Sequence, residues 1–223
     1  MTPDANGHVR DMLRSLPSLK GPFPPIDFST FPDTPQQAFL DWLGDAIAGG
    51  IKEPHAMTLS TVDADGRADA RMLILKNVDE RGWHFATHID SPKGRQLLAN
   101  PESALTFYWA QLGRQVRIRG RAVPLPDREC AADFLERPTS ARVIAMASMQ
   151  SQPLHPAELA DRLHDAQSLF DKNPHHVLSA WKVMAVAPRS AEFWQGASDR
   201  NHKRLCYSAS DDGAGWVKAV LCA

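Results

Sequence analysis

The sequence predicts a mostly β protein in which antiparallel strands form a closed or split barrel and a few helices pack against it. Two observations support this fold class. Between residues 55 and 125, apolar runs alternate with the turn segments "DADG" and "DERG", which are typical of hairpins. Helical periodicity is confined to a few short stretches around these runs.

The N-terminal residues, 1–32, are rich in proline ("SLPSLKGPFPPIDFSTFP"), and we expect an arm that lies over another surface. The rest of the chain, 33–223, is expected to form a single domain. That part opens with a helix over 33–50, because Asp33 or Thr34 can cap it and Pro35 suits its first turn. A glycine pair ends this helix.

The remaining elements follow from the alternation of apolar patterns and turn residues along the chain. Strands are expected within 56–89, 103–110 and 114–125, and later at 177–187, 190–196, 202–208 and 216–221. Helices are expected at 91–100, 127–137 and 156–172. The last of these is amphipathic, with its apolar side chains at helical spacing.

Composition narrows the class of protein. Lys and Arg (25) nearly balance Asp and Glu (26), so the formal net charge of -1 does not favour non-specific nucleic-acid binding. No apolar run is long enough for a membrane span, and the N-terminus does not resemble a signal peptide. The three cysteines lack CxxC spacing, which indicates free thiols in a reducing cytoplasm, and no metal-binding motif is present.

A candidate anion site lies at the start of the helix expected at 91–100. Ser91 can cap this helix, Pro92 suits its first position, and Lys93 and Arg95 lie in its first turn. Cations oppose the helix dipole at this end unless an anion is bound there. The segment therefore predicts a phosphate site, with a solvated surface lysine as the alternative.

A second basic cluster occurs in "DRNHKR", residues 199–204. Arg200, His202 and Arg204 are spaced two apart, so a strand would place all three on one face, where they need an anionic or electron-rich partner. Gln115 begins an alternating strand, and its amide can both donate and accept hydrogen bonds.

Six motifs occur in order and resemble the pyridoxamine 5'-phosphate oxidase family. They are "RMLILK", "ERGWHFAT" with "SPKGRQLLANP", "FYWAQLGRQVRIRGRA", "FLERP", "QSQ" and "EFWQGASDRNHKR". The resemblance covers residues 36–208 and implies an FMN-binding split β-barrel of six or more antiparallel strands. It also implies a homodimer in which each flavin site is assembled from both subunits.

The resemblance also implies site residues. Those expected to bind FMN are Arg71, Met72, Leu73, Ile74, Leu75, Lys76, Ala86, Thr87, Lys93, Gln115, Gln150, Ser151, Trp194 and Arg204. Those expected to hold the substrate and its phosphate are Lys76, Asp133, Arg137, Ala141, Arg200 and His202. Of these, Arg200 and His202 are expected to orient the substrate for catalysis.

Three positions in or beside the expected site depart from the family pattern. Pro92 replaces an arginine that helps to hold the FMN phosphate, Asp133 replaces a tyrosine, and Ala141 replaces a serine. A carboxylate near a substrate phosphate weakens binding, because like charges repel strongly in a partly desolvated pocket.

The implied activity is FMN-dependent oxidation of pyridoxamine or pyridoxine 5'-phosphate by oxygen, which forms pyridoxal 5'-phosphate and hydrogen peroxide. Two alternatives remain open. One is an oxidase of the same fold with another substrate, for example a phenazine precursor, and the other is a flavin-binding module without turnover.

Overall fold

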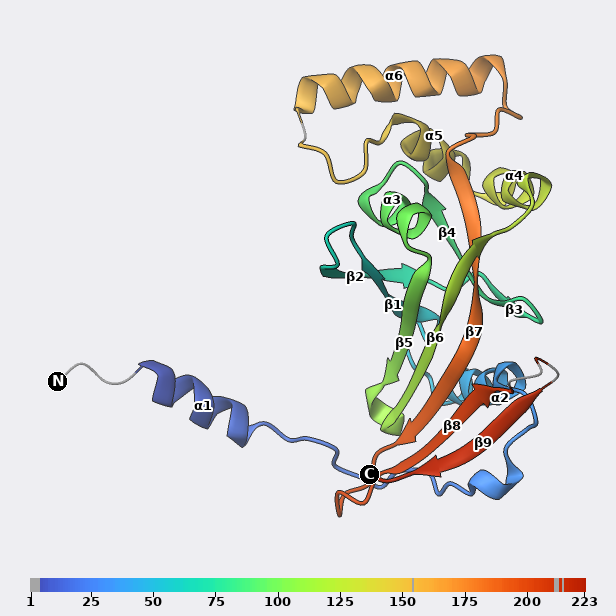
Figure 1. The fold of residues 1–223 in the computed structure, drawn as a ribbon. Coiled ribbons are helices and arrows are strands. Elements are labelled where there is room, and N and C mark those ends of the chain that lie inside the picture. Colours follow the sequence, from blue (N-terminus) through green and yellow to red (C-terminus); the bar gives the residue numbers. More distant parts are fainter. Residues whose placement is uncertain (1–4, 154, 211–212, 214) are drawn as a thin grey trace.

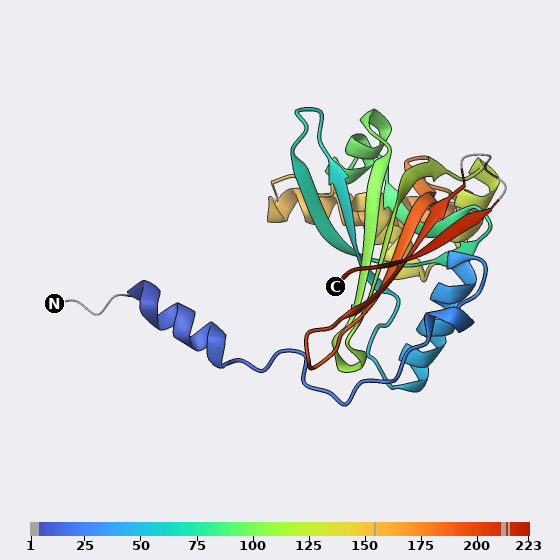
Figure 2. The ribbon, with the colours of Figure 1, turned by 60° about the horizontal axis from the view of Figure 1, so that its bottom comes forward.

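A curled antiparallel sheet forms the centre of the molecule. The computed structural model describes residues 5–153, 155–210, 213 and 215–223. Its nine-stranded sheet has the order β2-β1-β5-β6-β7-β4-β3, with β8 and β9 continuing from β7. The strands are β1 (Ala56–Val62), β2 (Ala68–Ile74), β3 (Asn77–Asp79), β4 (Gly82–His88), β5 (Glu102–Trp109), β6 (Arg114–Pro124), β7 (Trp181–Gln195), β8 (Lys203–Ala209) and β9 (Trp216–Leu221). Every strand pair is antiparallel and the sheet curls into a half-barrel, as expected (Figures 1 and 2).

The long strand β7 joins the two ends of the molecule. Its first half pairs with β4 and its second half with β8, while β6 runs beside almost its whole length. The prediction of two separate strands at 177–187 and 190–196 was therefore wrong. The strand passes through Pro188 because the register with β6 shifts between Arg119 and Gly120. Only glycine fits there, since a Cβ on Gly120 would lie 2.0 Å from the carbonyl oxygen of Ala187.

Helix α2 (Pro35–Ala48) covers the open side of the half-barrel at one end (Figure 2). It begins as expected, with the Thr34 hydroxyl accepting a hydrogen bond from the Gln37 amide at 3.3 Å. Phe39 and Trp42 from this helix are buried against Phe107 and Phe193 of the sheet. Burial of such large aromatic rings makes this the main hydrophobic core.

The remaining helices gather at the other end of β7 (Figure 1). They are α3 (Pro92–Ala99), α4 (Asp127–Glu136), α5 (Thr139–Ala147) and α6 (Pro156–Lys172). Three of these four agree with the expected helices, and α5 was not expected. No helix in the described ranges is long and apolar enough to cross a membrane.

The N-terminal arm has two parts. Its second part packs on the body, where Tyr207 donates a hydrogen bond to the Pro32 carbonyl at 2.7 Å and Phe31 contacts Phe193. Its first part contains helix α1 (Ala5–Ser15), which projects away from the sheet (Figures 1 and 2). This helix was not expected, and residues 1–4 of the predicted arm lie outside the described residues.

Candidate functional site

A cavity of about 650 Å³ lies at the helical end of the molecule. Residues from β2, β4, α3, the C-terminal end of α4, α5, α6, the segment between the last two helices and the start of β7 line it. The expected site residues among them are Leu73, Ala86, Thr87, Lys93, Arg137, Ala141 and Gln150. The fold thus brings together residues that are as far apart in the sequence as β2 and α5.

Lys93 is a buried cation in the wall of this cavity. Helix α3 begins as expected, because the Ser91 hydroxyl accepts a hydrogen bond from the Gly94 amide at 3.2 Å. The Lys93 ammonium donates to the Gln150 side-chain oxygen at 2.7 Å and to the Ser91 hydroxyl at 3.3 Å. The residue is only 6% exposed, so the alternative of a solvated surface lysine was wrong.

The electrostatic environment of Lys93 favours an anion. Burial, with a smaller contribution from the nearby Arg71 guanidinium, lowers the pKa of Lys93 to about 8. Within the described part of the chain, no carboxylate lies within ion-pair distance of its ammonium group. A buried charge without a counterion is costly, so a bound anion in the cavity would compensate it.

Most of the expected run 71–76 does not line the cavity, although Leu73 does. Arg71 is held by Asp69 at 2.5 Å and donates to the Thr61 hydroxyl at 2.6 Å. Met72 is 63% exposed and faces away, whereas Leu75 is buried in the core. This alternation follows from the strand itself, since successive side chains of β2 point to opposite faces.

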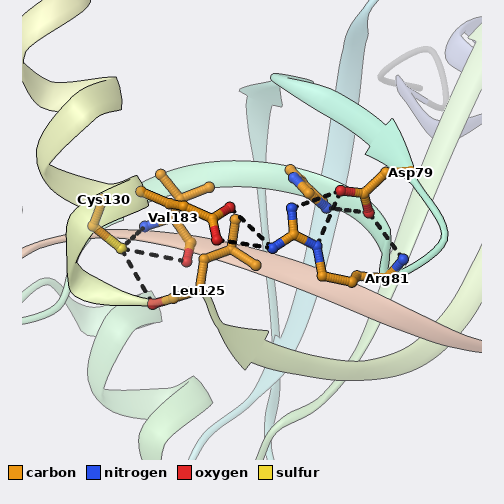
Figure 3. Close-up of polar contacts among 7 residues, drawn as sticks. Asp79, Arg81, Leu125, Cys130 and Val183 are labelled. Carbon is orange, nitrogen blue, oxygen red and sulfur yellow. Dashed lines mark hydrogen bonds and ion pairs between the residues drawn. The ribbon is translucent and has the colours of Figure 1, made fainter.

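Helix α4 is fastened to the sheet by two sets of polar contacts (Figure 3). Arg81, in the turn after β3, donates to the Glu129 carboxylate at 2.9 Å and is also held by Asp79. On the next residue of the helix, the Cys130 sulfur accepts a hydrogen bond from the Val183 amide of β7 at 3.3 Å. These contacts hold the following turn of α4, which carries Asp133, against β7.

Asp133 lies at the centre of a small network beside the cavity. Its carboxylate pairs with the Lys76 ammonium at 3.0 Å and accepts a hydrogen bond from the Trp181 indole nitrogen at 2.8 Å. The Arg137 guanidinium lies over the Trp181 ring, 4.1 Å from its centre. One Arg137 nitrogen donates to the Ala141 carbonyl at 3.3 Å, whereas Nε is buried and has no hydrogen-bond partner among the described residues.

The Arg137 guanidinium is a second candidate for binding an anion. Burial lowers the pKa of Arg137, and the Asp133 carboxylate opposes this shift. In the described part of the chain, no carboxylate lies within ion-pair distance of Arg137. The Arg137 guanidinium lies over Trp181, which was not among the expected site residues. The sequence around it, "WKVMAV" (residues 181–186), has no spacing that indicates this contact.

The other expected residues lie near the far end of β7. Gln115 of β6 pairs with Trp194 of β7, which in turn pairs with Arg204 of β8, so the three form a row across the sheet. The Arg204 guanidinium is held by both oxygens of Glu192, at 3.0 and 3.1 Å. Ser151, by contrast, follows Gln150 and has a backbone φ of +66°.

The prediction of one strand face for Arg200, His202 and Arg204 was wrong, because β8 begins only at Lys203. Arg200 lies in a turn with a φ of +67°, where its amide donates to the Ala197 carbonyl at 3.1 Å. Asp199 stabilises this turn by accepting a hydrogen bond from the Asn201 amide. Short polar side chains that bond to their own backbone favour turns over strands.

His202 nevertheless lies beside the row, with its ring 4.9 Å from that of Trp194. The His202 Nδ1 atom accepts a hydrogen bond from the Ala197 amide at 3.1 Å. A nitrogen that accepts such a bond carries no proton, so the neutral ring presents Nε2–H as a donor.

The cavity and this row are too far apart to bind one small ligand within a single subunit. Trp181 lines the cavity at the start of β7, whereas Trp194 lies near its end. At about 3.3 Å per residue, these positions are separated by roughly 40 Å along the strand. Either the row serves a different site, or it completes the cavity of a second copy.

Comparison with known proteins identifies the family. A family model described as "Pyridoxamine 5'-phosphate oxidase" matches residues 43–165. A second, described as "Pyridoxine 5'-phosphate oxidase C-terminal dimerisation region", matches residues 181–223. A pyridoxine/pyridoxamine 5'-phosphate oxidase of Bordetella petrii is 43% identical over 82% of this chain and 87% of its own length. The corresponding protein of Thermosynechococcus vestitus is 44% identical over 81% and 85%.

Two solved structures are similar in fold. The crystal structure of PhzG from Burkholderia lata 383, in complex with tetrahydrophenazine-1-carboxylic acid, has a TM-score of 0.81 at 29% identity and covers 91% of this chain and all of that one. A pyridoxamine 5'-phosphate oxidase-related, FMN-binding protein from Nostoc punctiforme has a TM-score of 0.69 at 16% identity, with coverages of 85% and 98%. The chain therefore belongs to the pyridoxamine 5'-phosphate oxidase family, whose fold it shares.

Proposed function

We propose that the protein is an FMN-dependent oxidase that acts on a planar, anionic substrate, with pyridoxamine or pyridoxine 5'-phosphate as the first candidate. The observation that supports this most is Lys93, a buried cation in the wall of the cavity that has no carboxylate within ion-pair distance among the described residues. The names of the relatives support the choice of substrate.

The residues of the cavity fit FMN. A volume of about 650 Å³ is within the usual range for small-molecule sites. Lys93 and the start of α3 would hold the phosphate, because backbone amides and a cation converge there. Leu73, Ala86, Thr87 and Gln150 would line the rest of the cofactor site. When bound, FMN would supply the acceptor for a hydride from the substrate and return the electrons to oxygen.

The protein would act as a homodimer in which the row Gln115–Trp194–Arg204 of one copy completes the cavity of the other. The separation of the two groups along β7 supports this arrangement. So does the match of residues 181–223 to a dimerisation region. Val217 and Val220, on β9 in that region, are 58% and 70% exposed and would be covered on dimerisation.

The side chains would mainly position the substrate. Arg137 would bind its anionic group, and His202 of the second copy would donate a hydrogen bond from Nε2 to its polar edge. Arg200, on the same turn, would cover the outer face of the substrate ring.

A second candidate substrate is a phenazine-type carboxylic acid. The similarity to PhzG in complex with tetrahydrophenazine-1-carboxylic acid favours it, since the match covers all of that chain. The replacement of a tyrosine and a serine by Asp133 and Ala141 also favours a substrate other than a phosphate ester.

An anaerobic titration tests the proposal. The protein is loaded with FMN, and pyridoxamine 5'-phosphate, pyridoxine 5'-phosphate or tetrahydrophenazine-1-carboxylic acid is added while the visible flavin spectrum is recorded. Loss of the flavin absorbance with any of them supports an oxidase and identifies its substrate class. Bound FMN that none of them reduces would contradict turnover and favour the flavin-binding module.

A further inference from the structure

We propose that Asp133 determines the charge of the substrate that this cavity accepts, so that the second candidate class, a planar monocarboxylate, is favoured over the first, a phosphate monoester. This inference rests on the proposed function, because it assigns Lys93 to the cofactor phosphate. It depends on three contacts among Lys76, Asp133, Trp181 and Arg137.

The first contact neutralises a cation that lies beside the cavity. The Asp133 carboxylate lies 3.0 Å from the Lys76 ammonium, and the side chains are 17% and 35% exposed. A pair that is partly shielded from water has no net charge to offer a ligand. Once Lys93 is assigned to FMN, Arg137 is the cation in the described cavity wall that has no carboxylate partner, since Arg162 lies 3.8 Å from Glu158.

The second and third contacts prepare Arg137 to bind. The Trp181 indole nitrogen donates to Asp133 at 2.8 Å, which fixes the orientation of the ring. The Arg137 guanidinium lies over the face of this ring. Among the residues that the structure describes, the buried Nε of Arg137 has no hydrogen-bond partner, and one further nitrogen donates to the Ala141 carbonyl. A guanidinium fixed in this way can bind a carboxylate through two parallel hydrogen bonds.

The charges then favour a monoanion. Lys76, Arg137 and Asp133 together carry one net positive charge. A carboxylate neutralises this charge, whereas a phosphate monoester carries about 1.5 to 2 negative charges at neutral pH and leaves uncompensated negative charge beside Asp133 in a partly desolvated site. Ala141 offers no hydroxyl to a phosphate oxygen.

The remaining lining suits an extended ring system. Ile144, Ala145, Met149 and Leu159 present apolar side chains to the same cavity as Arg137. Apolar walls beside a single fixed guanidinium are suited to an aromatic acid.

The test compares two ligands that share one ring and differ in their anion, 1-naphthoate and 1-naphthyl phosphate. Their dissociation constants for the FMN-loaded protein are measured at neutral pH by calorimetry and by the shift in the flavin spectrum. The variants are Asp133→Asn, which removes the charge and keeps an oxygen for Trp181, and Asp133→Ala, which removes both. Asp127→Asn is the matched control, because Asp127 lies on the same helix and pairs with Lys182 at 2.7 Å but is 88% exposed.

We expect the wild type to bind 1-naphthoate at least as tightly as 1-naphthyl phosphate. Asp133→Asn should tighten the phosphate about tenfold and the carboxylate about threefold, because the repulsion scales with ligand charge. Asp133→Ala should weaken the carboxylate, since Trp181 and Arg137 lose their support, and the control should change either constant less than about twofold.

Two results would overturn the inference. One is a ratio of the two dissociation constants that is the same in the wild type and in Asp133→Asn. The other is a wild type that prefers the phosphate. The ratio of the two dissociation constants is also measured by calorimetry without FMN, so that the role of Asp133 is tested even if the protein takes up no flavin. Failure to take up flavin would contradict the proposed function alone.

Discussion

At the residue scale, the burial of Lys93 distinguishes the start of α3 from an ordinary helix start. Its ammonium group is held by Gln150 and Ser91 and is buried without a carboxylate at ion-pair distance in the described part of the chain. The lysine and the helix start were predictable from "SPKGR", because cations in a first turn are unfavourable without an anion. Its contact with Gln150 was not predictable, since the two residues are brought together only by the fold.

Lys93→Ala should weaken FMN binding by about 1.5–3 kcal/mol, the usual contribution of a hydrogen bond to a charged group. Titration of the flavin-free protein, followed by quenching of FMN fluorescence, measures the change. Arg95→Ala is the control, because Arg95 lies in the same turn of α3 but is exposed. Equal losses in both variants would argue against a specific phosphate contact.

FMN affinity should fall as the pH rises through about 8, the value to which burial lowers the pKa of Lys93. Below that pH the lysine of the flavin-free protein carries the charge that the phosphate requires, and above it the charge is lost. In the unfolded chain the lysine keeps its ordinary pKa of 10.5 and binds more protons between these values. The stability of the flavin-free protein should therefore rise with pH across this window.

Lys93→Arg provides the control for this pH dependence, because arginine stays protonated throughout the range. Its FMN affinity should be nearly constant between about pH 7 and about pH 9.5. If the variant loses affinity over the same range as the wild type, another group titrates.

The paired change Asp133→Tyr with Ala141→Ser should lower KM for pyridoxine 5'-phosphate by about tenfold or more, with a smaller change in kcat. It removes the charge that binds Lys76 and adds two hydroxyls, each contributing about 0.5–1.5 kcal/mol, where 1.4 kcal/mol corresponds to one decade. Steady-state kinetics with this substrate measure the effect, and an unchanged KM would show that the pocket does not hold the phosphate at these positions.

At the scale of elements, the close approach of α3 to the end of β4 places Lys93 in the cavity. A Cβ on Gly94 would lie 2.2 Å from the Ile89 carbonyl oxygen and 2.6 Å from that of His88, so only glycine allows this approach. The helix itself was predictable from its cap and its proline, whereas α5 was not. It begins directly after Pro138, without a side-chain cap, and is only nine residues long.

Gly94→Ala should displace α3 and abolish measurable FMN binding while the sheet remains folded. Fluorescence titration and thermal unfolding followed by circular dichroism measure the two effects. Gly44→Ala in α2 is the control, because a Cβ there meets no atom within 4 Å. Replacing a mid-helix glycine should raise stability by up to about 1 kcal/mol and leave FMN affinity unchanged. Normal FMN binding by Gly94→Ala would contradict this role of α3.

At the scale of the whole molecule, the antiparallel sheet and its hairpins were predictable because turn residues separate the strands. The continuity of β7 was not, because Pro188 normally interrupts a strand and the compensating register shift lies on β6. Nor could the sequence show that the expected site residues divide between the two ends of β7. That division makes a site shared between two copies the central claim.

Mixing two damaged proteins tests this claim most directly. Lys93→Ala damages the cavity, and Arg204→Ala damages the row at the other end of β7. In a mixed dimer one site carries both changes and the other carries neither, because a twofold dimer pairs each cavity with the row of its partner. Each variant alone should bind FMN weakly, and random mixing after co-expression should restore tight FMN binding to about one quarter of the subunits. If co-expression restores no tight FMN binding, each site is built within one chain, and the claim of a shared site is contradicted.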